Sequence, residues 1–186
     1  MKKSGSVRFL ALTFVVVMFT GSFLLCLPCA NINAGVPYID HLFTAVSATC
    51  VTGLLTVAIG ETYTLFGQIV ILVLIQIGGL SLMSFVALFL MMMGKRITLT
   101  EKKIISDALN KSSMSSVASF MKRVLAYTAL FEGIGFVLFL FIFVPEFGLF
   151  KGLFTSLFTS VSAFCNAGMD TLGSTSLEKY LTHPLM

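Results

Sequence analysis

Apolar residues along this chain gather into long runs that are separated by short polar or basic stretches. The runs at residues 7–27, 66–93 and 117–144 each supply the roughly 20 residues that a helix needs to cross a bilayer core. Pro28 and Pro145 directly follow the first and third runs, so we expect each proline to end its helix. The pattern predicts an all-α integral membrane protein with about three transmembrane helices.

One short stretch occurs twice, at residues 43–54 and again at residues 158–169, and the copies share Phe, Thr, Val, Ser, Ala, Cys and Gly at equivalent positions. Each copy is too short to cross a bilayer. The first reads as a half-length helix, residues 38–49, that runs into small residues ended by a glycine. This layout is typical of a re-entrant pore loop, because irregular backbone at membrane depth is tolerated where it lines a water-filled path.

The repeated stretch divides the chain into three parts. Residues 1–98 are expected to form a first repeat of helix, pore loop and helix. Residues 99–116 are expected to form a cytoplasmic connecting segment. Residues 117–186 would then be an incomplete second repeat, with an outer helix and a pore loop. The expected architecture is therefore three transmembrane helices and two pore loops.

Basic residues gather at residues 2–8 and 95–123, on either side of the first two apolar runs. The positive-inside rule makes both clusters cytoplasmic, so we expect a multi-pass protein of the cell (plasma) membrane with a cytoplasmic N-terminus. Residues 1–28 also fit a signal peptide, but the length of the first run favours an uncleaved helix. An apolar fraction of 57% excludes an ordinary soluble domain, and the placement of the charge gives no reason to expect nucleic acid.

The end of each repeated stretch is the candidate selectivity filter for a cation. Glycine adopts backbone angles that aim successive carbonyls at one axis, and such carbonyls replace the hydration shell of an ion. The negative end of each half-helix would point toward the same place. The candidate residues are Thr49, Cys50, Val51, Thr52 and Gly53 in the first copy and Phe164, Cys165, Asn166, Ala167 and Gly168 in the second. A buried turn without an ion is the alternative, and the repetition favours the filter.

Polar and small residues interrupt the second and third apolar runs. Gly78 and Gly79 would either allow close helix packing or let the inner helix bend. Gln76, beside them, suits a packing role and a pore-facing role equally well. Glu132 is a charge inside the third run, which makes it a functional site by default, although a role in bracing helices is the alternative that we favour.

The four cysteines are not spaced as a metal site. Cys26 and Cys29 have the C-x-x-C spacing of redox motifs but lack a βαβ context. Cys50 and Cys165 occupy equivalent repeat positions, which favours packing behind the loops. No phosphate-binding loop, zinc spacing or nucleophile and base pair is present, so we expect neither enzymatic activity nor a covalently bound cofactor, and K⁺ as the only metal.

Three motifs in this order, at residues 48–54, 76–80 and 162–168, make the chain resemble the Trk/Ktr/HKT superfamily of potassium transporters. The single span before the first motif is most similar to the membrane (pore) subunit of bacterial Ktr systems. The resemblance implies four repeats in one chain, arranged with pseudo-fourfold symmetry around one filter. Each repeat would contribute one filter glycine, here Gly53 and Gly168, and glycine at these positions goes with potassium selectivity.

The same resemblance implies further properties of the whole subunit. It implies a homodimer that associates with a cytosolic nucleotide-binding regulatory subunit, and uptake that is often coupled to Na⁺. The chain holds one repeat and the first half of a second, so we expect the N-terminal part of such a subunit, with K⁺ as its substrate. The alternative is a non-conducting membrane scaffold or regulatory fragment that assembles with other subunits.

Overall fold

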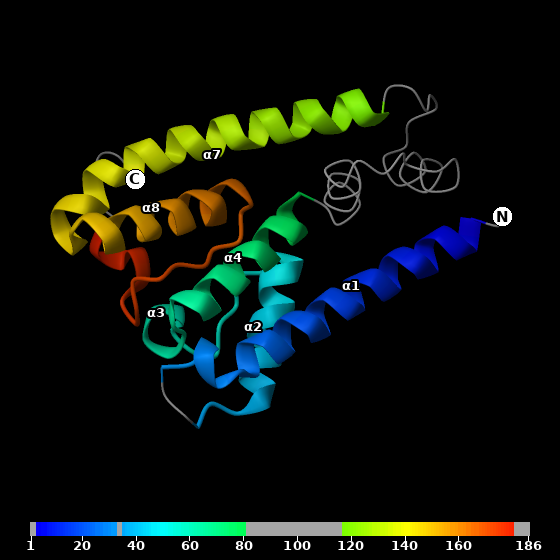
Figure 1. The fold of residues 1–186 in the computed structure, drawn as a ribbon, viewed down its shortest axis with the longest axis horizontal. Coiled ribbons are helices and arrows are strands. Elements are labelled where there is room, and N and C mark those ends of the chain that lie inside the picture. Colours follow the sequence, from blue (N-terminus) through cyan, green and yellow to red (C-terminus); the bar gives the residue numbers. More distant parts are fainter. Residues whose placement is uncertain (1–2, 33–34, 81–116, 181–186) are drawn as a thin grey trace.

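The computed structural model describes residues 3–32, 35–80 and 117–180, which form helices joined by turns and extended stretches (Figure 1). Within these ranges there is no β-strand, and an isolated bridge pairs Asn31 with Tyr63. The described residues therefore confirm the all-α class. The connecting segment expected at residues 99–116 and the end of the second apolar run lie outside the described residues.

Residues 3–32 and 35–80 contain five helical elements. They are α1 (Lys3–Cys26), the 3₁₀ helix η1 (Pro28–Ala30), α2 (Tyr38–Cys50), α3 (Ile59–Thr62) and α4 (Leu65–Gly79). The first helix ends before Pro28, as expected, because proline is favoured in the first turn of the helix that follows. The half-length helix appears as α2, with Asp40 in its first turn, where a carboxylate suits the positive end of the helix dipole.

The second part contains α7 (Val117–Phe147), α8 (Leu149–Phe164) and the 3₁₀ helix η2 (Ser176–Tyr180). Our prediction that Pro145 ends the third span is wrong, because α7 continues to Phe147. Pro145 has no amide to donate to the carbonyl of Phe141, so the helix loses one hydrogen bond there and continues for two more residues. The Gly148 amide closes that turn on the carbonyl of Val144 at 3.0 Å.

Among the described residues, Arg123–Phe147 is the one helical stretch long and apolar enough to cross a membrane. The stretches Ala11–Cys26 and Leu65–Gly79 are apolar but shorter. Large side chains on α7 face outward, and Phe141 is 70% exposed. An apolar helix with such exposure suits lipid better than the core of a soluble protein.

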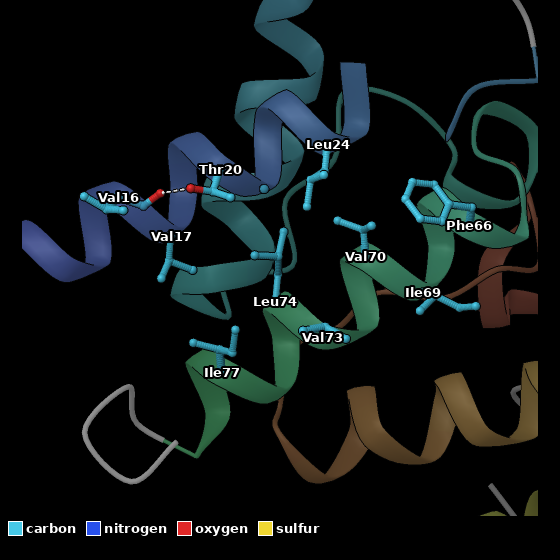
Figure 2. Close-up of a pocket in the computed structure, with 11 residues that line it drawn as sticks. Val16, Val17, Thr20, Leu24, Phe66, Ile69, Val70, Val73, Leu74 and Ile77 are labelled. Atoms are coloured by element: carbon cyan, nitrogen blue, oxygen red, sulfur yellow. Dashed lines mark hydrogen bonds between the residues drawn. The ribbon is translucent and has the colours of Figure 1, made fainter. Parts of the chain in front are cut away.

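A cavity of about 530 Å³ lies between α1 and α4, and Figure 2 shows the apolar side chains of both helices that line it. Thr20 is the polar side chain in this lining, and its hydroxyl donates to the carbonyl of Val16 on its own helix at 2.8 Å. No side-chain donor therefore faces the cavity without a partner. Such a surface is compatible with lipid tails or with further apolar protein.

The chain between Ile32 and Thr62 leaves one end of α1 and returns to it. The Ile32 amide donates to the Thr62 carbonyl, and the Thr64 amide donates to the Ala30 carbonyl, each at 2.9 Å. The Thr64 hydroxyl also donates to the Cys29 carbonyl at 2.6 Å. These bonds join the two ends of this segment, so the chain leaves for α2 and returns from it beside the end of α1.

The second part repeats this path. In Figure 1, α8 lies alongside α7, and the chain after α8 runs back past it to η2. There Tyr180 donates to Glu146 at 2.5 Å, and Lys179 forms an ion pair with the same carboxylate. The Tyr180 ring meets Phe143 edge-on, with centroids 5.4 Å apart. The end of the second excursion is thereby fixed to the end of α7, where the excursion began.

A buried pair fixes the beginning of α2 to the chain that returns from it. His41 is 2% exposed, and its Nδ1 lies 3.0 Å from the hydroxyl of Tyr63, which is fully buried. Burial lowers the pKa of His41, because desolvation disfavours the imidazolium, although the nearby Asp40 acts in the opposite direction. Burial likewise raises the pKa of Tyr63. His41 is therefore neutral in the folded protein at neutral pH.

The depressed pKa of His41 predicts a dependence of stability on pH. The unfolded chain binds a proton at the ordinary histidine pKa of 6.5, where the folded protein does not. The stabilisation is therefore fully present above that pH and is lost progressively as the pH falls below it. We expect the thermal unfolding midpoint of the purified protein in detergent to fall on acidification. In His41→Gln this part of the pH dependence should disappear, and an unchanged pH profile in that variant would contradict the assignment.

Candidate functional site

The two repeated stretches fold alike. A residue in the left-handed conformation follows each helix, Val51 directly after α2 and Asn166 two residues after the end of α8, each with φ of 57°. The next amide bonds back to the carbonyl five residues earlier in both copies, Thr52 to Ser47 at 3.0 Å and Ala167 to Ser162 at 2.7 Å. This is the geometry of a Schellman cap. A left-handed valine is rare because its branched β-carbon crowds the backbone, so the fold holds Val51 in a strained state.

The glycines that end the two stretches lie against each other. Gly53 has φ of 74° and Gly168 has φ of 66°, and both values disfavour any side chain. A Cβ on Gly53 would lie 2.6 Å from the Ala167 carbonyl oxygen and 3.4 Å from the Gly168 Cα. A Cβ on Gly168 would lie 3.7 Å from the Gly53 Cα. The tertiary structure thus brings together two segments that are far apart in the sequence.

The paired glycines of α4 lie behind both segments. A Cβ on Gly78 would lie 2.2 Å from the Thr49 carbonyl oxygen, and one on Gly79 would lie 2.4 Å from the Cys165 Sγ. The backbone of α4 therefore packs directly on the C-terminal ends of α2 and α8. Within the described residues these glycines serve close packing, and α4 continues through them to Gly79. The negative ends of two helix dipoles meet beside them.

A polar network connects α4, α7 and the end of α8. Gln76 Nε2 donates to Glu132 Oε1 at 2.9 Å, and the Cys165 thiol donates to Gln76 Oε1 at 3.7 Å. The Ser160 hydroxyl donates to the Glu132 backbone carbonyl at 2.6 Å. Gln76 therefore has its partners inside the protein, and Glu132 makes the contact that a bracing role requires.

The candidate filter residues differ in burial. Thr49 and Ala167 are buried, and the Thr49 hydroxyl donates to the Ala45 carbonyl at 2.7 Å. Val51, Gly53 and Cys165 are intermediate, whereas Cys50, Thr52, Phe164, Asn166 and Gly168 are exposed. We expected both repeat cysteines to pack behind the loops. Cys165 does so, because Gly79 of α4 lies directly against it, but the expectation is wrong for Cys50, whose side chain is exposed in the described structure.

Sequence reasoning missed the contact between the outer loops of the two parts. Glu61 Oε1 accepts the backbone amide of Ser174 at 2.9 Å. A Cβ on Gly60 would lie 2.2 Å from the Thr171 carbonyl oxygen, so the loops interlock at backbone distance. Neither Gly60 nor Glu61 belongs to the repeated stretch, and no local pattern in the sequence links them to residues more than a hundred positions away.

Residues 5–186 match the TrkH family, described as cation transport proteins. The chain belongs to the TrkH family. The resemblance drawn from the three motifs is therefore confirmed. TrkH proteins are transporters and not enzymes, so membership supports a membrane location, cation transport and the absence of catalysis.

Relatives in this family carry names that refer to potassium. The chain is 39% identical over 177 residues to the potassium/sodium uptake protein NtpJ of Enterococcus hirae. It is 41% identical over 175 residues to the Ktr system potassium uptake protein B of Bacillus subtilis, and 38% identical over 184 residues to the protein of that name in Vibrio alginolyticus. These alignments cover 95%, 94% and 99% of this chain but only 39%, 39% and 40% of the relatives. The chain thus corresponds to the N-terminal part of these TrkH relatives.

Proposed function

We propose that this TrkH chain is the N-terminal part of a potassium uptake protein. In this proposal residues 49–53 and 164–168 are the first and second filter segments of a single selectivity filter made of backbone carbonyls. The observation that carries the proposal is the contact between Gly53 and Gly168, each with positive φ at the end of an equivalent capped helix. Two repeated segments that meet at their glycines are what a filter shared between repeats requires.

The fold gives the proposal a physical basis. Each filter segment follows a helix that enters and returns on one side, and irregular backbone at membrane depth is tolerated where it lines a water-filled path. Carbonyl oxygens replace the water shell of a monovalent cation in such a path. The C-terminal ends of α2 and α8 converge behind the segments, and their negative dipole ends favour a cation over an anion.

The topology follows from the basic clusters. We place the N-terminus and residues 95–123 on the cytoplasmic side and the starts of α2 and α8 on the external side. The predicted spans at residues 7–27, 66–93 and 117–144 then cross the membrane, and α4 is the described part of the inner helix that backs the filter. Lipid therefore contacts the outward apolar faces of α1 and α7.

The whole protein is proposed to act as the resemblance to Ktr subunits implies. It would form a homodimer, associate with a cytosolic nucleotide-binding regulatory subunit and couple K⁺ uptake to Na⁺. The names of the relatives support K⁺ as substrate, and that of the Enterococcus hirae protein includes sodium as well. No covalently bound cofactor is part of this proposal.

Uptake of potassium tests the proposal. The complete product of the gene would be expressed in cells that lack their own potassium transporters, and K⁺ uptake would be measured with and without excess Na⁺. We expect growth at low K⁺, uptake that is faster with Na⁺ than without it because of the proposed coupling, and only weak competition for the filter when Na⁺ is in excess. If the protein reaches the membrane but no uptake above that of the empty vector occurs, the filter assignment is wrong and a non-conducting scaffold becomes the better interpretation.

A further inference from the structure

A polar network that joins two other helices lies behind the second filter segment. Glu132 of α7 and Gln76 of α4 meet behind Cys165. The equivalent of Cys165 is Cys50, whose side chain is exposed. A carboxyl group, an amide and a thiol thus meet behind the second filter segment.

Hydrogen-bond chemistry dictates how the Gln76 amide is oriented. Glu132 Oε1 accepts a hydrogen bond from the NH₂ group of Gln76 at 2.9 Å, and an amide that donates on one side presents its carbonyl oxygen on the other. The amide carbonyl oxygen of Gln76 is then left to face Cys165, whose thiol donates to it. Glu132 therefore selects the orientation in which Gln76 accepts from the second filter segment.

Two further contacts hold α4, α7 and the end of α8 together. Gly79 brings the α4 backbone against Cys165, with no room for a side chain between them. Ser160, one turn before the end of α8, donates to the Glu132 carbonyl at 2.6 Å and so joins α8 to α7. Cys165 directly precedes the left-handed Asn166, and Gly168 lies two residues further on. A shift at Cys165 therefore moves the carbonyls of the segment.

We infer that Gln76 and Glu132 are positioning residues that hold the second filter segment in place and thereby set the preference for K⁺ over Na⁺. This inference rests on the proposed function. A filter discriminates between ions through the position of its carbonyls, and groups behind it act by fixing that position. Neither side chain contacts the ion in this assignment. Their role is to hold the backbone at Cys165.

Substitutions that remove the network test the inference in the complete gene product. Gln76→Leu and Glu132→Leu should each lower the ratio of K⁺ to Na⁺ affinity, measured from the KM values for uptake, on the order of tenfold. Glu132→Gln should stay close to wild type, because its amide oxygen still accepts the bond from Gln76. Gln68→Leu is the matched control on α4, since Gln68 Nε2 donates to the Tyr63 carbonyl and not to α7.

An exchange of the two side chains keeps the test informative where a leucine variant does not assemble. Gln76→Glu alone places two carboxyl groups together. Gln76→Glu combined with Glu132→Gln restores both hydrogen bonds: position 132 now donates to position 76, and the Cys165 thiol still donates to position 76. We expect the double variant to recover the K⁺ preference that the single variant loses. If it does not recover, or if the leucine variants change only the amount of protein and leave the ratio intact, the inference is wrong.

Gly168→Ser separates this inference from the proposed function. If Gly168→Ser lowers the ratio of K⁺ to Na⁺ affinity and the network variants leave it unchanged, the filter assignment is supported and the positioning role of Gln76 and Glu132 is wrong. If Gly168→Ser also leaves the ratio unchanged, the filter assignment itself is overturned.

Discussion

Replacing Gly53 by serine is expected to remove most K⁺ uptake and most of the preference for K⁺ over Na⁺. Any Cβ at this position would lie 2.6 Å from the Ala167 carbonyl oxygen, which is backbone and has little freedom to move. The φ of 74° also disfavours a side chain, with a strain of about 1–3 kcal/mol for such a residue. At about 1.4 kcal/mol for each factor of ten, the loss should be on the order of tenfold or more.

The matched variant is Gly168→Ser at the equivalent position. Its φ is 66°, but the nearest atom to a new Cβ would be the Gly53 Cα at 3.7 Å, which is an ordinary contact. We therefore expect Gly168→Ser to reduce uptake and selectivity clearly less than Gly53→Ser does. Uptake of K⁺ and Na⁺, normalised to the amount of protein in the membrane, measures both. Equal effects of the two substitutions would show that contact with the Ala167 carbonyl is not the reason why position 53 requires glycine.

The second large effect is expected at Gly78, where α4 packs on the end of α2. A Cβ there would lie 2.2 Å from the Thr49 carbonyl oxygen and 2.9 Å from Val51 Cγ2, so Gly78→Ala forces the helices apart. Overpacking of this kind destabilises by about 1–3 kcal/mol. We expect a lower thermal unfolding midpoint in detergent and less protein in the membrane.

Gly133 supplies the control for this prediction. It also lies inside a helix, α7, but a Cβ there would meet nothing within 4 Å. Gly133→Ala should therefore leave packing intact and stabilise the helix by about 0.5–1 kcal/mol. The two substitutions make the same chemical change and should move the unfolding midpoint in opposite directions. A midpoint for Gly78→Ala at or above wild type would exclude close packing at this glycine.

The Gly53 prediction rests on a wider feature, which is that the two parts of the chain approach each other closely at glycines. Gly53 meets Ala167 and Gly168, and Gly79 meets Cys165. The outer loops meet in the same way, where Gly60 lies against the Thr171 carbonyl. Small residues at helix interfaces permit such close approach inside a membrane, where the packing of side chains is not driven by water. A side chain at any of these positions acts on both parts at once.

The local features of the fold could be predicted from the sequence. The half-length helix at residues 38–49 corresponds to α2, and the first helix ends before Pro28, because helix periodicity, turn residues and prolines act on their immediate neighbours. The repeated stretch also predicted two similar segments, and both have the same cap and the same sign of φ at glycine. The effect of Pro145 was predicted wrongly, since α7 continues for two residues beyond it despite the hydrogen bond that proline removes.

The tertiary structure decided everything that depends on residues distant in the sequence. The sequence marked Gln76 and Glu132 as polar groups in apolar runs. Their hydrogen bond joins residues 56 positions apart on two helices, and no local pattern encodes such a pairing. The exposure of Cys50 beside the partial burial of Cys165 has the same origin, because equivalent residues in a repeat share a backbone conformation but not the neighbours that pack against them. The sequence alone determined the helices, the repeat and the family, since these follow from local order along the chain. The tertiary structure decided which side chains support the two segments, because α4 packs behind both of them. It also decided which glycine has no space for a side chain.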